Sequence, residues 1–216
     1  MKRLHDRIEA GRELARKLTA YSGSKECVVV GLPRGGVPVA AEIARELRLP
    51  LDVFMVRKLG VPYQPELAMG AIASGGVRVM NPSVVSDLGI SLSEIESVAA
   101  TEAKELDRRE KLYKPPGPSP GFRDKVVIVV DDGVATGATM SAAIAALRKH
   151  RVRKVIVAIG VAPPDTIGRL WNEADEVVCV LEPDPLQAIS LWYDEFPQVT
   201  DDEVRSALST AHPAAA

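Results

Sequence analysis

The chain has 216 residues, a length that fits a single domain with at most a modest appendage. Hydrophobic residues make up 46% of it, enough to build a core, which excludes a disordered chain or a small disulfide scaffold. Its 27 Lys and Arg against 29 Asp and Glu give a net charge of -2, so nothing favours broad attraction to nucleic acid or to an anionic membrane.

The first quarter of the chain predicts a helix and then a strand, turn, helix and strand. Apolar residues recur at helical spacing from Arg3 to Leu18. A β-branched run predicts a buried strand at Glu26–Gly31, and a glycine-rich turn follows it. The remaining elements of this unit are the turn Leu32–Gly36, the helix Val37–Leu47 and the strand Leu51–Val56. Because a helix separates the two strands, we expect them to be parallel.

The next segment is broken by glycine and proline. Arg57–Leu67 is predicted to be a loop at the end of the second strand and a candidate mobile cover, in which Gln64 and Glu66 could meet substrate or metal. A hairpin should follow, with strands Met69–Ser74 and Val77–Met80. Ser91 or Ser93 then caps a helix that runs to about Leu112, and Tyr113–Gly121, rich in proline, forms a semi-rigid connection.

The second half of the chain continues with alternating strands and helices. The most apolar strand is Lys125–Val130, and a helix ending near Lys149 follows it. The later elements expected are the strand Lys154–Val161, the helix Pro163–Asn172, the strand Glu176–Leu181, the irregular stretch Glu182–Val199, the helix Glu203–Leu208 and a frayed tail. This alternation favours an α/β fold with a mostly parallel, twisted sheet flanked by helices.

The segment that ends the most apolar strand carries the strongest chemical signal. Asp131 and Asp132 emerge together, and small, glycine-containing and hydroxylated residues lead from them into a helix. Free N–H groups at a helix N-terminus bind phosphate, and Gly137 allows close approach of the backbone. Since carboxylates beside a phosphate repel it, we expect a polyol between them, as in a phosphorylated sugar.

Alternative interpretations of this segment are less favoured. A solvated strand end and an ordinary helix cap would explain the acidic pair alone, but not the acids, the Gly-Thr turn and the helix start together. A nucleotide-binding P-loop needs a lysine after its glycines, where this chain has Ala138 and Thr139. A dinucleotide-binding fold needs a GxGxxG pattern, which Gly31, Gly35 and Gly36 do not form.

The stretch Val129–Thr139 resembles the ribose-phosphate motif of type I phosphoribosyltransferases. The resemblance implies that Asp131 and Asp132 bind the ribose 2'- and 3'-hydroxyls of phosphoribosyl pyrophosphate. It also implies that the following loop holds the 5'-phosphate, through Gly133, Val134, Ala135, Thr136, Gly137, Ala138 and Thr139. Over nearly all of residues 1 to 208, the chain resembles bacterial proteins described only as phosphoribosyltransferases, for which no acceptor base is assigned.

A second motif is similar to the pyrophosphate loop of the same family, in the Arg-Gly-Gly form of the xanthine-type enzymes. It comprises Pro33, Arg34, Gly35 and Gly36. By this resemblance we expect a strained or cis peptide at Pro33-Arg34 or Arg34-Gly35. Arg57 and Lys58 resemble the basic pair of orotate-type enzymes that neutralises pyrophosphate, although two cations at a strand end are also commonly just solvated.

The resemblance further implies a mechanism with Mg2+ held mainly by substrate oxygens and by no direct protein ligand. Asp131, Asp132, Arg34 and Lys58 would be the catalytic residues, stabilising an electron-poor ribose and a pyrophosphate leaving group. The product would be a nucleotide, formed on a purine or pyrimidine type of base. One departure is Ala135, which stands where 6-oxopurine enzymes carry a proton-transferring acid.

The family builds its acceptor pocket from a small hood outside the sheet. We expect the N-terminal helix, residues 1–22, and residues 182–210 to form it around a core of residues 23–181, with residues 211–216 as the frayed tail. Trp192, Tyr193 and Asp194 are the candidate pocket residues, and an aromatic cluster that joins hood to core is an equally weighted alternative.

Several expectations concern partners and location. The partners expected are phosphoribosyl pyrophosphate and a small base, with neither nucleic acid nor membrane, in a homodimer. Cys27 and Cys179 lie in valine-rich runs and are expected to be buried thiols, consistent with the cytoplasm. The alternative function is a non-catalytic regulatory protein that binds phosphoribosyl pyrophosphate or a nucleotide through the same site.

Overall fold

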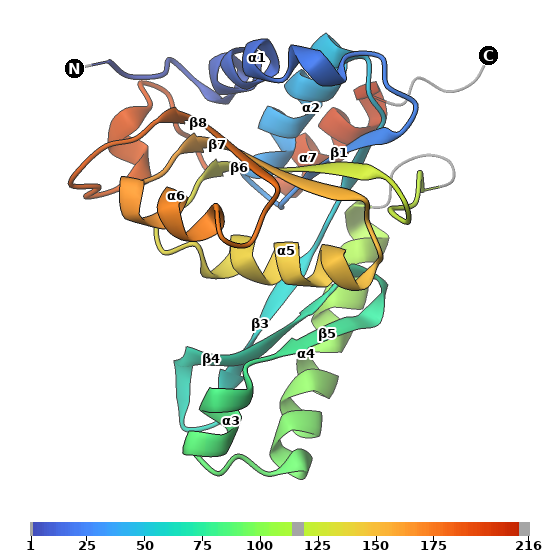
Figure 1. The fold of residues 1–216 in the computed structure, drawn as a ribbon, viewed down its shortest axis with the longest axis vertical. Coiled ribbons are helices and arrows are strands. Elements are labelled where there is room, and N and C mark those ends of the chain that lie inside the picture. Colours follow the sequence, from blue (N-terminus) through green and yellow to red (C-terminus); the bar gives the residue numbers. More distant parts are fainter. Residues whose placement is uncertain (1, 114–118, 212–216) are drawn as a thin grey trace.

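The computed structural model describes residues 2–113 and 119–211, and its centre is a parallel sheet (Figure 1). Five strands lie in the order β2-β1-β6-β7-β8. Their bounds are β1 Cys27–Gly31, β2 Leu51–Val53, β6 Val126–Gly133, β7 Lys154–Val161 and β8 Glu176–Leu181. All neighbouring strands pair in parallel. The predicted α/β fold with a parallel sheet is therefore confirmed.

Helices cover both faces of this sheet. The helices α1 (Arg7–Lys17), α2 (Gly36–Leu47) and α7 (Asp201–Ala211) lie on one face, and α5 (Ala138–Lys149) and α6 (Pro164–Leu170) lie on the other (Figure 1). Along β6, Ile128 and Val130 belong to the first core, whereas Val127 and Val129 belong to the second. Successive side chains of this strand thus point to opposite faces, as the pleat of a strand requires.

A smaller unit, which we call the arm (residues 56–113), projects from the main body below the sheet in Figure 1. Its antiparallel sheet has the order β3-β4-β5, with β3 Val56–Val61, β4 Gln64–Ala73 and β5 Val77–Met80. The helices α3 (Pro82–Asp87) and α4 (Leu92–Tyr113) complete it. The arm has its own small core, formed by Leu59, Val61, Met69, Ile72, Ile95 and Ala99.

The prediction of a loop at Arg57–Leu67 is wrong. These residues form β3 and the start of β4, joined by a two-residue turn at Pro62 and Tyr63. The pairing register shifts on both sides of Gly60, where a Cβ would lie 2.6 Å from the carbonyl oxygen of Pro65. A bulge therefore accommodates the glycine and prolines that made the segment resemble a loop, since bulges tolerate residues that regular ladders exclude.

Other boundaries differ from the predictions in smaller ways. The first helix begins at Arg7 with Asp6 as its N-cap, and before it Leu4 pairs with Tyr193. The strand predicted at Leu51–Val56 ends at Val53, and α3 was not predicted. The hairpin was predicted correctly, and its turn uses positive φ at Gly75 and Gly76.

Two further expectations are only partly visible. Residues 114–118 of the proline-rich connection and residues 212–216 of the expected tail lie outside the described residues. The short 3-10 helices η1 (Thr19–Tyr21), η2 (Ser74–Gly76) and η3 (Ile189–Trp192) complete the described elements. Within the described part of the chain, none of the helices combines the length and the apolar character needed to cross a membrane.

Candidate functional site

Two loops meet at the carboxyl ends of the adjacent strands β1 and β6. A Cβ at Gly35 would overlap the carboxylate of Asp132, and one at Gly36 would overlap the carbonyl oxygen of Val130. Any side chain at these two positions would push the loops apart, so glycine is required for their close approach. The structure thus brings together the two motifs that lie about a hundred residues apart in the sequence, as the carboxyl ends of parallel strands allow.

The loop after β1 leads directly into the N-terminus of α2. The peptide bond between Pro33 and Arg34 is cis, at one of the two places expected. The N–H of Gly36 donates to the carbonyl of Leu32 at 3.0 Å and closes the turn. The Arg34 side chain is 36% exposed, and its guanidinium lies 3.6 Å from the carboxylate of Asp201. A helix N-terminus with a nearby arginine is suited to an anionic ligand.

The loop after β6 turns into α5 through a left-handed glycine. Gly137 has φ +77°, a conformation that other residues rarely adopt. Thr136 and Thr139 are exposed beside the start of α5. Exposed threonines next to a helix N-terminus are residues suited to binding a phosphate.

The helix α6 supports the same loop from behind, which the sequence did not indicate. The hydroxyl of Thr166 donates to the carbonyl of Ala135 at 2.7 Å, and Arg169 donates to the carbonyl of Thr136 at 3.0 Å. Thr166 is 2% exposed. These bonds fasten two carbonyls of the loop to α6.

The two adjacent acids have different environments. Asp131 is half-buried, and its Oδ1 accepts a hydrogen bond from the backbone N–H of Asp132 at 2.9 Å. Burial, together with the nearby charge of Asp132, raises the pKa of Asp131 well above its usual range. Asp132 is 8% exposed and forms an ion pair of 2.7 Å with Arg7 of α1. Neither this asymmetry nor the role of Arg7 was predicted.

The basic pair lies on β3 and not at the end of β2. Arg57 forms an ion pair of 2.6 Å with Glu102 of α4. Lys58 is exposed and lines a cavity of about 330 Å³ between the arm and α5, which Thr139 also lines. A smaller cavity of about 40 Å³ is lined in part by Pro33, Arg57, Thr139 and Arg109. Arg57 therefore lies near both loops and Lys58 near the loop after β6, and Arg109, which was not predicted, lines the same cavity as Arg57.

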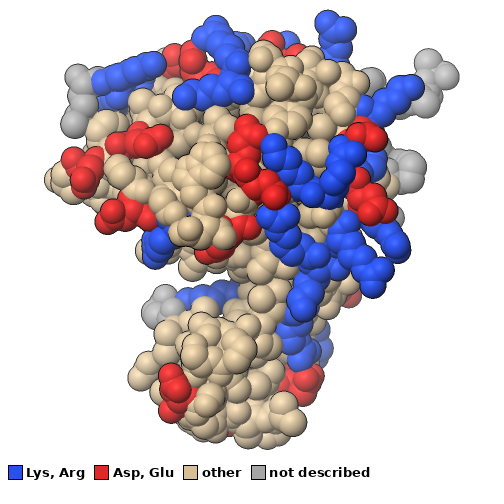
Figure 2. All heavy atoms as spheres, in the orientation of Figure 1, with Lys and Arg blue, Asp and Glu red and all other residues tan. Residues whose placement is uncertain are grey.

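Basic side chains gather where α4 leaves the main body, as Figure 2 shows. Asp201 lies among Arg34, Arg108 and Arg109, whose positive charges help to lower its pKa after the larger effect of a hydrogen bond from Tyr113. The local surplus of positive charge fits an anionic ligand, although the whole chain is slightly acidic. Among the described residues, no group of three or more His, Cys, Asp and Glu side chains is arranged to hold a metal ion.

The two segments that we expect to form the hood contact each other. Leu4 pairs with Tyr193 in a parallel bridge, and its N–H donates to the carbonyl of Trp192 at 2.9 Å. Tyr193 is 1% exposed, stacks on Phe196 and donates its hydroxyl to the carbonyl of Asp132 at 2.7 Å. Tyr193 therefore joins hood to core, and its ring is covered and not open to a base.

The other two candidates for the acceptor pocket are more accessible. Trp192 is half-buried against the core, and Asp194 is exposed and forms an ion pair of 3.1 Å with Arg3. Ile189, three residues before Trp192, contacts the loop after β6, since a Cβ at Gly133 would overlap its side chain. The hood thus lies over the end of β6.

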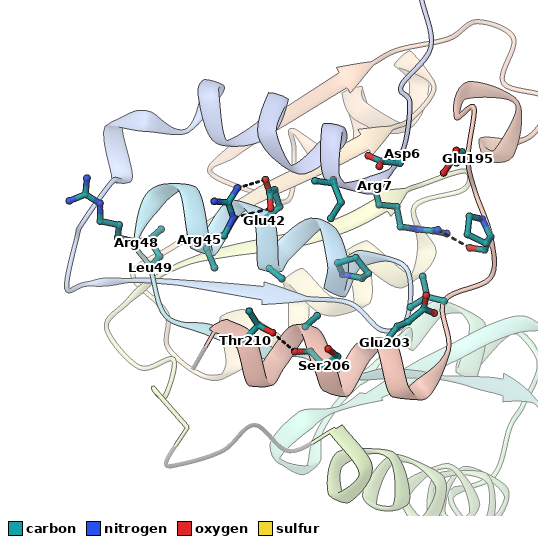
Figure 3. A pocket seen from close by; sticks show the side chains of 17 residues that line it. Asp6, Arg7, Glu42, Arg45, Arg48, Leu49, Glu195, Glu203, Ser206 and Thr210 are labelled. Carbon is teal, nitrogen blue, oxygen red and sulfur yellow. Dashed lines mark hydrogen bonds and ion pairs between the residues drawn. The ribbon is translucent and has the colours of Figure 1, made fainter. Parts of the chain in front are cut away.

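A groove of about 750 Å³ lies between α1, α2, α7 and the hood (Figure 3). It lies apart from the two loops, because neither the loop after β1 nor the acidic pair lines it. Two of its charged groups, Glu42 and Arg45, are paired with each other at 2.6 Å. Arg7 links the groove to the site, because it lines the groove and also reaches Asp132.

The chain is similar to several known proteins. The family model described as "Phosphoribosyl transferase domain" matches residues 1–193. Two Mycobacterium tuberculosis proteins named as candidate phosphoribosyl transferases, MT0597 of strain CDC 1551 and Rv0571c of strain H37Rv, are each 45% identical over 212 residues. The match covers 98% of this chain and 48% of each relative, so the chain spans about half their length. Among solved structures, the crystal structure of TT1426 from Thermus thermophilus superimposes on this chain with a TM-score of 0.85, and the two sequences are 40% identical. The superposition covers 95% of this chain and 97% of the TT1426 chain.

Proposed function

The chain belongs to the phosphoribosyl transferase domain family, and we propose that it transfers the 5-phosphoribosyl group from phosphoribosyl pyrophosphate to a nitrogenous base, with release of pyrophosphate. The acceptor would be of purine or pyrimidine type. The observation that carries this proposal is the contact between the loop after β1, at Gly35, and the acidic pair, at Asp132. A sugar that bears a pyrophosphate next to its hydroxyls would place each group at one of these two loops.

The residues divide the substrate between them. The acidic pair would accept hydrogen bonds from the ribose hydroxyls, and the loop Gly133–Thr139 would bind the 5'-phosphate at the N-terminus of α5. Arg34, with the backbone around Gly35, would bind the pyrophosphate, and the arm would contribute Arg57, which shares a small cavity with Pro33, and Lys58. Cations at these positions stabilise charge that grows on the leaving group as the bond to C1 of the ribose breaks.

Magnesium suits the chemistry of this site. The substrate offers phosphate and hydroxyl oxygens, which are the ligands that this ion prefers, so the ion would be held mainly by the substrate and not by a direct protein ligand. When bound, the ion would neutralise part of the charge of the pyrophosphate. The remaining contribution of the protein is to position the ribose between its two loops and to hold the leaving group with fixed cations.

The test is a calorimetric titration of the protein with phosphoribosyl pyrophosphate in the presence of Mg2+, followed by a pyrophosphate-release assay with a panel of bases. Binding together with release that depends on one base would support the proposal. Binding without release would favour the regulatory alternative, and release without any base would indicate a hydrolase. Absence of binding would overturn the proposal.

A matched pair of variants assigns the site. Asp131→Asn keeps the size of the side chain but replaces a carboxyl oxygen, which can accept a hydrogen bond from a ribose hydroxyl, with an amide group that donates, and we expect it to weaken binding of the sugar pyrophosphate by about 10-fold or more. Asp87→Asn, on the exposed end of α3 in the arm, makes the same chemical change away from the site and should bind as the wild type does. Equal affinity in both variants would contradict the assignment of Asp131.

A homodimer stays a prediction, which sedimentation of the purified chain would test.

A further inference from the structure

Arg7 joins the N-terminal helix to the acidic pair. It is the first residue of α1, and its Nε donates to Oδ2 of Asp132 at 2.7 Å. The two side chains are only 10% and 12% exposed. Two buried charges persist only when each compensates the other, so removing one partner leaves the other uncompensated.

The hood fixes the Arg7 guanidinium from two further sides. Nη1 donates to the carbonyl of Pro197 at 2.8 Å, a bond that Figure 3 shows leaving α1 toward the hood. The guanidinium carbon also lies 3.9 Å from the centroid of the Phe196 ring. A planar guanidinium held by an ion pair, a carbonyl and an aromatic face has little freedom to turn.

The other side of Asp132 is closed by the loop after β1 and by Tyr193. A Cβ at Gly35 would overlap the Asp132 carboxylate, and the Tyr193 hydroxyl donates to the Asp132 carbonyl at 2.7 Å. The carboxylate thus lies between Arg7 and the loop expected to bind pyrophosphate. If Arg7 were lost, the carboxylate would have to find a new partner within a few ångströms of both loops.

We propose that Arg7 is a positioning residue, which acts through its ion pair to set the place of the Asp132 carboxylate at the ribose site and so couples the hood to that site. This inference rests on the proposed function. The position of Asp132 on the strand supports it, because the alternation along β6 directs Asp132 toward α1 and α2, where Val130 also points. The pair is therefore built into the fold, 125 positions apart in the chain.

The test compares variants by calorimetric titration with phosphoribosyl pyrophosphate and Mg2+, well below their unfolding temperatures. We expect Arg7→Met to weaken binding by about 10-fold or more, and Arg7→Lys to restore part of the loss. Arg12→Met is the control: Arg12 is also on α1, but it is 54% exposed and pairs with Glu42, which keeps Arg45 as a second partner. It should bind as the wild type does.

A double-mutant cycle separates positioning from a general loss of structure. If Arg7 acts only through Asp132, then Arg7→Met combined with Asp132→Asn should bind no more weakly than Asp132→Asn alone. Losses that multiply would show that Arg7 acts independently and would overturn the inference. Wild-type affinity in Arg7→Met, with only its unfolding temperature lowered, would overturn it as well.

Two outcomes need separate treatment. If Arg7→Met does not fold, the same cycle is run with Arg7→Lys, for which coupling to Asp132 is again expected and independence again contradicts the inference. A wild-type chain that fails to bind phosphoribosyl pyrophosphate overturns the proposed function and this inference with it. A wild type that binds, with Arg7 variants of equal affinity, overturns this inference alone.

Discussion

The guanidinium of Arg34 lies 3.6 Å from the carboxylate of Asp201, the first residue of the last helix. Asp201 in turn accepts a hydrogen bond from the hydroxyl of Tyr113 at the end of α4. Burial, together with this bond, raises the pKa of Tyr113 to about 12, so the hydroxyl keeps its proton. One carboxylate therefore joins three elements at the place where pyrophosphate is proposed to bind, and it competes for the same cation.

Neutralising that carboxylate should strengthen anion binding. Asp201→Asn keeps a side-chain oxygen for Tyr113 but removes a negative charge from among Arg34, Arg108 and Arg109. We expect the affinity for pyrophosphate, measured by calorimetry at low salt, to rise by about 2- to 5-fold and the gain to shrink at high salt. Asp202→Asn, on the exposed neighbour that pairs with Arg205, is the control. Weaker binding in Asp201→Asn would instead show that Asp201 holds Arg34 in place.

The parallel sheet was predictable because its strands carry their own local signal. Uninterrupted β-branched runs such as Val126–Val130 are buried on both faces, and helical spacing between such runs predicts the flanking helices. The glycines of the two loops were equally informative, since Gly35, Gly36 and Gly137 mark places where a side chain cannot fit or where φ is positive. The strand runs and the glycine motifs can be recognised in short stretches of sequence, although the contacts that require Gly35 and Gly36 come from β6, about a hundred residues later.

The arm and the buried ion pair could not be predicted in the same way. β3 is stabilised by contact of Leu59 and Val61 with α4, some forty residues later, and a bulge hides its period. In the sequence, Arg7 is one of several charged residues on an amphipathic helix, and nothing near it indicates that it forms an ion pair with Asp132. Partners that are distant in the sequence leave no periodic pattern.

Gly35 and Gly168 should respond in opposite ways to the same change. Gly35→Ala forces a Cβ against the Asp132 carboxylate, and we expect a loss of about 1–3 kcal/mol in the free energy of unfolding along with weaker binding of the sugar pyrophosphate. Gly168 lies inside α6, and a Cβ there meets nothing within 4 Å. Gly168→Ala should therefore stabilise the fold by about 0.5–1 kcal/mol, measured by urea unfolding. A neutral Gly35→Ala would contradict the close approach of the two loops.

His150 fastens the arm to the main body. Its Nε2 donates to the carbonyl of Ser74 at 3.0 Å, and its ring packs edge-on against Phe54 and Phe122. His150→Phe keeps an aromatic ring but removes the donor, so we expect amide exchange in β4 and β5 to accelerate by about 5- to 10-fold while exchange in β6 and β7 is unchanged. His150→Ala, which also loses the ring packing, should show the larger effect. Uniform acceleration across both sheets would mean that the bond supports the whole fold and not the arm in particular.

Glu176 should make stability depend on pH in the acidic range. Burial alone would raise its pKa, but hydrogen bonds from Lys154 and Tyr21 outweigh that effect and lower it. Because the folded pKa lies below the unfolded value of roughly 4.3, the ionised group stabilises the fold above that pH, and the contribution is lost as the pH falls through the folded pKa. The side chain is 29% exposed, so we expect Glu176→Gln to remove only about 0.5–1 kcal/mol at neutral pH and to reduce the loss of stability between about pH 5 and pH 3. Urea unfolding over that range measures both values.

Lys154→Met should also reduce the loss of stability between about pH 5 and pH 3, because it removes the cationic partner of the Glu176 carboxylate. An unchanged pH dependence in both variants would show that Glu176 does not contribute.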